Sequence, residues 1–153
     1  MARERTGRAD RMLWAAAGGL LASIVIGVPM TMMGAIEDMV AGLVGSDSLA
    51  VGWAIHLVAG IVFAAPFGWL VARGSLPAMV GLGLLYGFAV GVLFAWLAVW
   101  LVLGLPLVVG EPAMVTDIAL HTLWGGIVGG VAWLGYARAA GGERERRRVG
   151  RPV

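Results

Sequence analysis

The chain has 153 residues, is 60% apolar, has a mean hydropathy of +0.91, and carries 11 basic and 9 acidic residues. This composition is improbable for a soluble globular domain and indicates an integral membrane protein with little mass outside the bilayer. The chain therefore has no room for a fold that reads a groove of a nucleic acid. The absence of cysteine excludes disulfides, thiolate metal sites and cysteine nucleophiles.

Four long apolar segments predict four transmembrane helices, since a helix needs about 20 apolar residues to cross the hydrocarbon core. We expect these helices over residues 12–36, 49–72, 77–103 and 114–137. The third apolar run is too long for one span, so we expect its helix to end before Gly104 and Pro106. The predicted fold is an all-α, polytopic transmembrane four-helix bundle with up-down-up-down topology, formed by residues 12–139.

Charge is distributed asymmetrically around these segments. All basic residues precede the first segment, separate the second from the third, or follow the fourth. The connections on the opposite side carry only acids, namely Glu37, Asp38, Asp47, Glu111 and Asp117. Because positive charge stays on the cytoplasmic side during insertion, we predict a multi-pass plasma-membrane protein with both termini in the cytoplasm. Residues 1–11 would form a basic N-terminal segment, and residues 140–153 a disordered, Arg-rich tail.

An offset of 65 residues relates the two halves of the chain. It superposes His56 on His121, Gly60 on Gly125 and Arg73 on Arg138, together with further identical pairs. One interpretation is a tandem duplication of a two-helix hairpin. The two hairpins would then be parallel and related by a pseudo-twofold axis along the membrane normal.

His56 and His121 are the first candidates for chemistry. Each lies about a turn and a half into its segment from the acidic side, and polar residues within a span usually face the bundle interior. Two imidazoles at matched depth would suit the iron of a b-type haem, with Gly60 and Gly125 leaving room for the porphyrin. The alternative is that both rings bond to backbone carbonyls or interfacial water. Haem ligation requires histidine backbones about 12–13 Å apart, whereas glycine-mediated packing of the second on the fourth helix requires about 8 Å.

Two further sets of residues bear on this site. Asp117 lies four residues before His121 on the same helix face, where a carboxylate either orients the imidazole or stabilises the helix N-terminus. Met30, Met32 and Met33 cluster in the first segment, and thioethers suit Cu(I). Adjacent helical residues point to different faces, however, and methionine also fills irregular apolar gaps.

Small residues recur at four-residue spacing in all four segments. This spacing puts them on one helix face, where the missing side chains let two backbones approach closely. We expect helix packing at these stripes, the clearest of which are Gly83, Gly87 and Gly91, and Gly125 and Gly129. A groove for a flat cofactor or a lipid tail is the alternative interpretation.

The sequences Ala54–Gly60 (AIHLVAG) and Ala119–Gly125 (ALHTLWG) resemble an element of small four-span bacterial and archaeal membrane proteins of unknown function. This resemblance implies the topology and no activity. Hydrolytic motifs such as Gly-x-Ser-x-Gly and His-Glu-x-x-His do not occur. We therefore expect a non-enzymatic small membrane subunit or oligomer-forming scaffold, in contact with the lipid bilayer and with copies of itself or a membrane-protein partner. The alternatives are a b-type membrane cytochrome and a small transporter or channel that acts as an oligomer.

Overall fold

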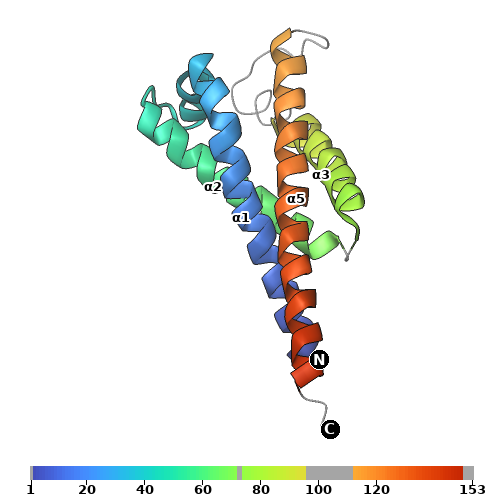
Figure 1. Cartoon of the computed structure of the whole chain (residues 1–153). Coiled ribbons are helices and arrows are strands. Elements are labelled where there is room, and N and C mark those ends of the chain that lie inside the picture. Colours follow the sequence, from blue (N-terminus) through green and yellow to red (C-terminus); the bar gives the residue numbers. More distant parts are fainter. Residues whose placement is uncertain (1, 72–73, 96–111, 150–153) are drawn as a thin grey trace.

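The computed structural model describes residues 2–71, 74–95 and 112–149, and these residues form helices and their connections only (Figure 1). The elements are α1 (Ala2–Met32), a π-helical turn η1 (Ile36–Val40), a 3-10 turn η2 (Ala41–Val44), α2 (Leu49–Leu70), α3 (Leu76–Val90), a π-helical turn η3 (Gly91–Ala95) and α5 (Pro112–Val149). Four stretches are long and apolar enough to cross a membrane, namely Gly7–Met32, Leu49–Leu70, Leu76–Leu93 and Met114–Arg138. The predicted all-α transmembrane bundle is confirmed.

The helix ends differ from the sequence prediction at both termini. The helix α1 already begins at Ala2, and α5 continues to Val149, so residues 140–149 are helical where we predicted a disordered tail. Four arginines and two glutamates in that stretch are strong helix formers and offset the two glycines, Gly141 and Gly142. Extending an existing helix also avoids the cost of nucleation. The predicted end of the third helix, and the loop that follows it, fall within residues 96–111 and lie outside the described residues.

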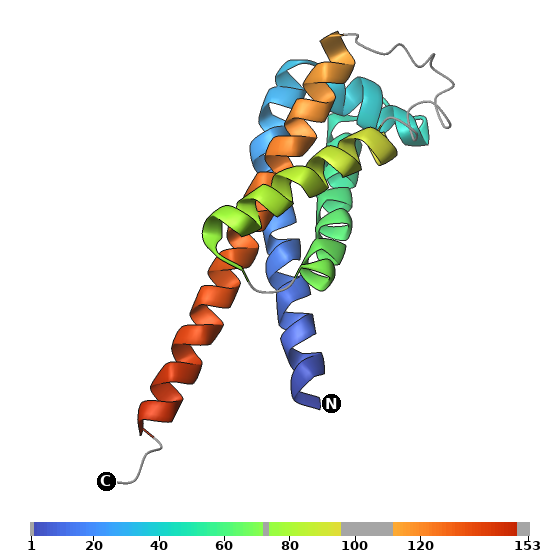
Figure 2. The same cartoon turned by 90° about the vertical axis from the view of Figure 1, so that its right-hand side faces the viewer.

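The bundle consists of two helical hairpins. The helix α1 packs along α2, and α3 packs along α5, while contact between α1 and α5 joins the two hairpins (Figures 1 and 2). The helices α2 and α3 touch only sparsely. A strict twofold relation between the hairpins would make the α2–α3 contact as extensive as the α1–α5 contact. The bundle is therefore closed on one side and loosely joined on the other.

Small residues make the close contact within each hairpin. In the first hairpin, a Cβ added to Gly60 would overlap the hydroxyl of Ser23, and a Cβ added to Gly19 would overlap the backbone of Gly60. In the second hairpin, a Cβ added to Gly125 would overlap the carbonyl oxygen of Gly83. Both hairpins thus gain the dispersion contacts that close helix approach allows in a bilayer.

These contacts occupy equivalent positions in the two hairpins. Gly60 and Gly125 are 65 residues apart, whereas their partners Gly19 and Gly83 are 64 residues apart. About two turns further along the first helix of each hairpin, Gly27 faces the rings of Trp53 and His56, and Gly91 faces the Cβ of His121. The hairpins therefore share one packing scheme, with a one-residue difference in offset between their first and second helices.

The connection from α1 to α2 depends on two glycines. Gly34 has φ 75° where α1 ends, and Gly45 has φ 70° where η2 ends. These left-handed conformations strain residues that carry a Cβ, so glycine is the favoured residue at both turns. The turns fold η1 and η2 back onto α2, where a Cβ at Gly52 would overlap the carbonyl oxygen of Ile36.

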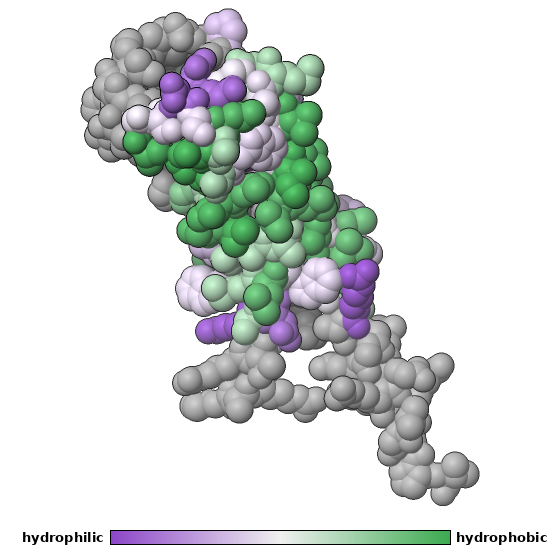
Figure 3. All heavy atoms as spheres, turned by 90° about the vertical axis from the view of Figure 1, so that its left-hand side faces the viewer, coloured by the Kyte–Doolittle hydropathy of each residue, from purple (hydrophilic) through white to green (hydrophobic). Residues whose placement is uncertain are grey.

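The surface of the molecule suits a bilayer. On the face shown in Figure 3, an apolar band separates two hydrophilic ends. Many large apolar side chains are exposed, among them Leu13, Val28, Met32, Val58, Leu85 and Leu123. The start of α1 and the end of α5 lie at the same end of the bundle (Figures 1 and 2). At that end Arg11 donates a hydrogen bond to the carbonyl of Gly68, and the guanidinium of Arg138 lies 5.2 Å from the centre of the Trp14 ring.

Candidate functional site

Both histidines line one cavity of about 270 Å³ near the acidic end of the bundle. Its walls come mainly from α1, α2 and α5, with η1 and η2 at the outer end and Val90 of α3 at one side. The polar side chains in the wall are Ser23, His56, Asp117 and His121, and the remaining lining residues are apolar or glycine. This arrangement agrees with the prediction that both histidines face the bundle interior at similar depth.

The cavity lies beside the loosely joined helices α2 and α3. Tyr86 of α3 forms a direct polar link between them, because its hydroxyl donates a hydrogen bond of 2.6 Å to the carbonyl of Phe63. The Tyr86 ring also packs against Trp124, with ring centroids 6.4 Å apart, and against Phe67, with centroids 5.4 Å apart. Phe63 and Trp124 line the cavity, so Tyr86 contacts two of its lining residues, the backbone of Phe63 and the ring of Trp124.

His56 is held by the backbone of α1. Its Nε2 lies 3.0 Å from the carbonyl oxygen of Ser23, and its ring meets Trp53 edge-on, with centroids 5.9 Å apart. A carbonyl oxygen can only accept a hydrogen bond. In a ring with one proton, Nε2 of His56 therefore carries the hydrogen and Nδ1 carries the lone pair.

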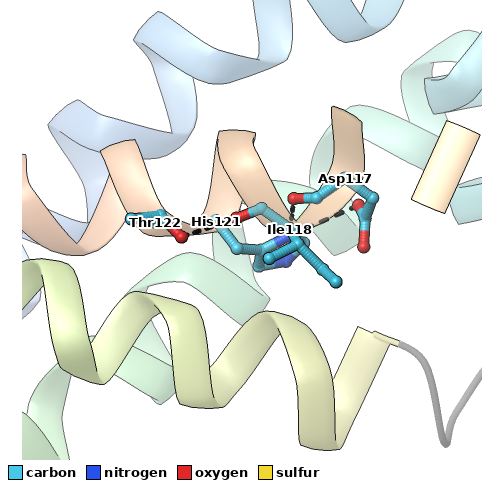
Figure 4. A network of polar contacts seen from close by, with 4 residues as sticks. All are labelled: Asp117, Ile118, His121 and Thr122. Carbon is cyan, nitrogen blue, oxygen red and sulfur yellow. Dashed lines mark hydrogen bonds and ion pairs between the residues drawn. The ribbon is translucent and has the colours of Figure 1, made fainter. Parts of the chain in front are cut away.

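His121 is held from within its own helix (Figure 4). Its Nδ1 lies 2.9 Å from the carbonyl oxygen of Asp117 and 3.3 Å from the Oδ1 of the same residue. Both oxygens accept, so Nδ1 carries the hydrogen and Nε2 carries the lone pair. Of the two roles that the sequence allowed for Asp117, the structure shows contact with the imidazole. The neighbouring hydroxyl of Thr122 bonds instead to the carbonyl of Ile118, at 2.7 Å.

A histidine that gives one N–H to a carbonyl or carboxylate is oriented as metal-bound histidines usually are. The described residues nevertheless include no group of three or more His, Asp or Glu side chains that could hold a metal ion. The three methionines of the predicted cluster also lie in different environments. Met30 is buried and lines the cavity, whereas Met32 at the end of α1 and Met33 in the turn after it are exposed. The three thioethers are therefore not brought together.

We expected Gly60 and Gly125 to make room for a porphyrin, but both glycines pack against neighbouring helices. Gly125 packs against Gly83, and Gly60 lines the cavity by its backbone while Ser23 fills the space of its missing side chain. The conflict between haem ligation and glycine packing disappears, because the glycine faces pack within the hairpins and not between α2 and α5. A dry cavity of about 150 Å³ holds benzene. A cavity of about 270 Å³ thus suits one substituted ring, whereas a porphyrin with four pyrrole rings needs a wider opening of the bundle.

All five glycines expected to mediate packing lie at the contact of α3 and η3 with α5, namely Gly83, Gly87, Gly91, Gly125 and Gly129. The sequence did not identify Ser23, Phe63, Tyr86 and Trp124 as neighbours of the histidines. In the sequence, a serine and three aromatic residues within apolar helices cannot be distinguished from residues that only pack one helix on another. Ser23 and Tyr86 belong to helices other than those of the histidines, so their place beside the site becomes visible only once the helix pairs are known.

No protein-family model, no curated protein and no solved structure matches the chain. The function is therefore inferred from the site itself. It combines two oriented imidazoles from different hairpins, a carboxylate beside one of them, and a mostly apolar wall. Such an arrangement can bind a small molecule that has an apolar body and a few hydrogen-bonding groups.

Proposed function

We propose that the chain is a small membrane subunit that binds a small molecule inside its helix bundle and has no catalytic activity of its own. The observation that carries this proposal is the shared cavity of about 270 Å³ between His56 and His121. Ligand sites are typically concave and apolar, with a small number of placed polar groups. Ionisable residues within a transmembrane segment also favour a functional role over a purely structural one.

The remaining parts of the proposal concern assembly and orientation. We propose that the protein acts as an oligomer or beside a membrane-protein partner, because its described connections between spans are short and its apolar faces are broad. We also propose that it lies in the plasma membrane with both termini in the cytoplasm, on the basis of its arginine distribution. The equivalent packing of the two hairpins supports their origin by duplication.

Cavity filling tests the binding role. Ala59 lines the cavity on α2, whereas Ala54 lies on the same helix, is exposed and does not line it. The wild-type protein, Ala59→Leu and Ala54→Leu are purified in mild detergent and examined by native mass spectrometry. We expect a non-covalently retained small molecule in wild type and Ala54→Leu, and its loss in Ala59→Leu, because leucine occupies the ligand space.

Equal retention in all three proteins would place the bound molecule outside this cavity and contradict the proposal. The absence of any retained molecule in wild type, with the bundle folded by circular dichroism, would contradict it as well. Thermal unfolding of both variants separates loss of binding from loss of fold.

A b-type cytochrome is the second candidate, because axial ligands from two hairpins would have to line a common cavity, as His56 and His121 do. In this arrangement Nε2 of His56 bonds to the Ser23 carbonyl, so iron ligation through Nε2 requires that ring to turn. A reduced-minus-oxidised absorption spectrum of protein expressed with haem available distinguishes the candidates. A sharp alpha band lost in both His56→Ala and His121→Ala would establish the cytochrome and replace the primary proposal.

A further inference from the structure

We infer that the cavity takes an aromatic diol of the hydroquinone type, with an apolar tail, an inference that rests on the binding role proposed above. Three properties of the cavity lead to this ligand class. They are the direction in which its polar groups hydrogen-bond, the separation of those groups on two hairpins, and the size and aromatic character of its wall.

Three of the four polar side chains in the wall offer hydrogen-bond acceptors, and the fourth, Ser23, has a hydroxyl that can donate or accept. His56 donates its N–H to Ser23, and His121 donates its N–H to Asp117, so each ring with one proton keeps an acceptor nitrogen. The carboxylate of Asp117 adds acceptor capacity beside His121. A ligand that pairs with these acceptors must donate, and the hydroxyl of a diol can also accept from Ser23. A quinone, whose carbonyl oxygens only accept, would leave these acceptors without partners, and that mismatch costs binding free energy.

The acceptors are divided between two helices. His56 belongs to α2 and His121 to α5, and these helices touch only sparsely. In the described part of the chain His, Asp and Glu side chains do not gather in threes as ligands of one metal ion would. A molecule that reaches across the cavity with one donor at each end satisfies both imidazoles, which one small ion does not.

The wall selects a flat, apolar body. Phe63 and Trp124 line the cavity together with aliphatic and thioether side chains such as Ile26 and Met30. Since about 150 Å³ is enough for benzene, the available 270 Å³ or so accommodates a six-membered ring with two hydroxyl groups and short substituents. Aromatic rings in offset or edge-to-face contact add to the apolar attraction.

The position of the cavity suits a molecule dissolved in the bilayer. It lies beside the loosely joined α2 and α3, within the membrane-spanning part of the bundle. The side chains of His121 and Asp117 keep 28% and 22% of their exposure, so the polar end of the cavity is accessible. A tail on the ring would remain in the lipid, and the two hydroxyls would enter between the histidines.

A matched pair of probes tests the inference without any redox step. The probes are decylhydroquinone and its dimethyl ether, which share ring and tail but differ in hydrogen-bond donors, and both are measured anaerobically with excess reductant by equilibrium dialysis. We expect the diol to bind wild type at least about tenfold more tightly than the ether, because two acceptors gain partners. In His56→Leu and in His121→Leu the preference should fall to about threefold or less. Thr122→Val is the control, since Thr122 bonds within α5 and does not line the cavity.

Equal or tighter binding of the ether by wild type would overturn the diol assignment, and so would a full preference for the diol in both histidine variants. Failure of both probes, with an endogenous molecule still lost only in Ala59→Leu, would overturn the ligand class and leave the binding role intact. Failure of both probes without any retained molecule would overturn both. The wild-type comparison needs no variant, so misfolding of a histidine variant does not remove the test.

Discussion

Gly83 of α3 and Gly125 of α5 lie so close together that a Cβ on either residue would overlap the carbonyl oxygen of the other. Because the contact is reciprocal, a side chain added at either glycine could be accommodated only if the two helices moved apart. In a bilayer, where burying apolar surface gives little advantage over lipid, such close backbone packing is a main source of helix association. The second hairpin therefore depends on the absence of two side chains.

We expect Gly83→Ala to destabilise the protein by about 1–3 kcal/mol, because the added methyl group forces α3 away from α5. Gly81 is the matched control on the same helix, since no heavy atom lies within 4 Å of a Cβ placed there. Gly81→Ala should be neutral or stabilising by up to about 1 kcal/mol, through helix propensity alone. Unfolding in mixed micelles with increasing dodecyl sulfate, followed by circular dichroism, measures both. Equal effects of the two substitutions would contradict the close α3–α5 contact.

The sequence predicted most of the fold because the bilayer imposes strong rules on it. Span length, charge asymmetry and glycine spacing each have one dominant physical cause, and the four spans and the packing role of Gly83, Gly87 and Gly91 follow from them. The pairing of the stripes was not predictable. A glycine face shows that a helix packs closely, but it does not identify the partner, so we considered α2 against α5 when the stripes pair within hairpins.

The site was predictable only in its ionisable residues. His56 and His121 stand out because polar side chains are costly in a span. The hydrogen bond from His56 to Ser23 depends on how α1 and α2 align, because the two partners are 33 positions apart in the sequence. The His121–Asp117 contact, by contrast, follows from four-residue spacing on one helix, and for this reason it was among the roles considered.

Tyr86→Phe tests the loosely joined side of the bundle. It removes the hydrogen bond to the Phe63 carbonyl and keeps the ring that packs against Trp124. We expect a loss of about 0.5–1.5 kcal/mol in the free energy of unfolding. The same variant should weaken decylhydroquinone binding several-fold, since Phe63 and Trp124 line the cavity. An unchanged stability would show that the α2–α3 link contributes nothing beyond the packing of the ring.

The two histidine rings should show opposite tautomers. Because the chain contains only two histidines, a ¹⁵N-histidine-labelled sample in micelles gives two ring systems without further assignment problems. We expect Nε2–H in His56 and Nδ1–H in His121, as their acceptor-only partners require. In Asp117→Ala the backbone carbonyl at that position remains, so His121 should keep its tautomer and shift its ring signals, while His56 stays unchanged. A doubly protonated His56 or His121 at neutral pH would contradict the acceptor character of the cavity.

Single cysteines test the orientation, because the natural chain has no cysteine and hence no labelling background. Val44→Cys places an exposed thiol at the acidic end, and Gly74→Cys places one in the exposed connection between α2 and α3. Neither changes the charge that directs insertion. A membrane-impermeant maleimide added to intact cells should label Val44→Cys, and label Gly74→Cys only after permeabilisation. The reverse pattern would place the acidic end in the cytoplasm. The expected pattern puts the cavity, which lies beneath η1 and η2, in the outer half of the membrane, so that its ligand enters from the outer leaflet.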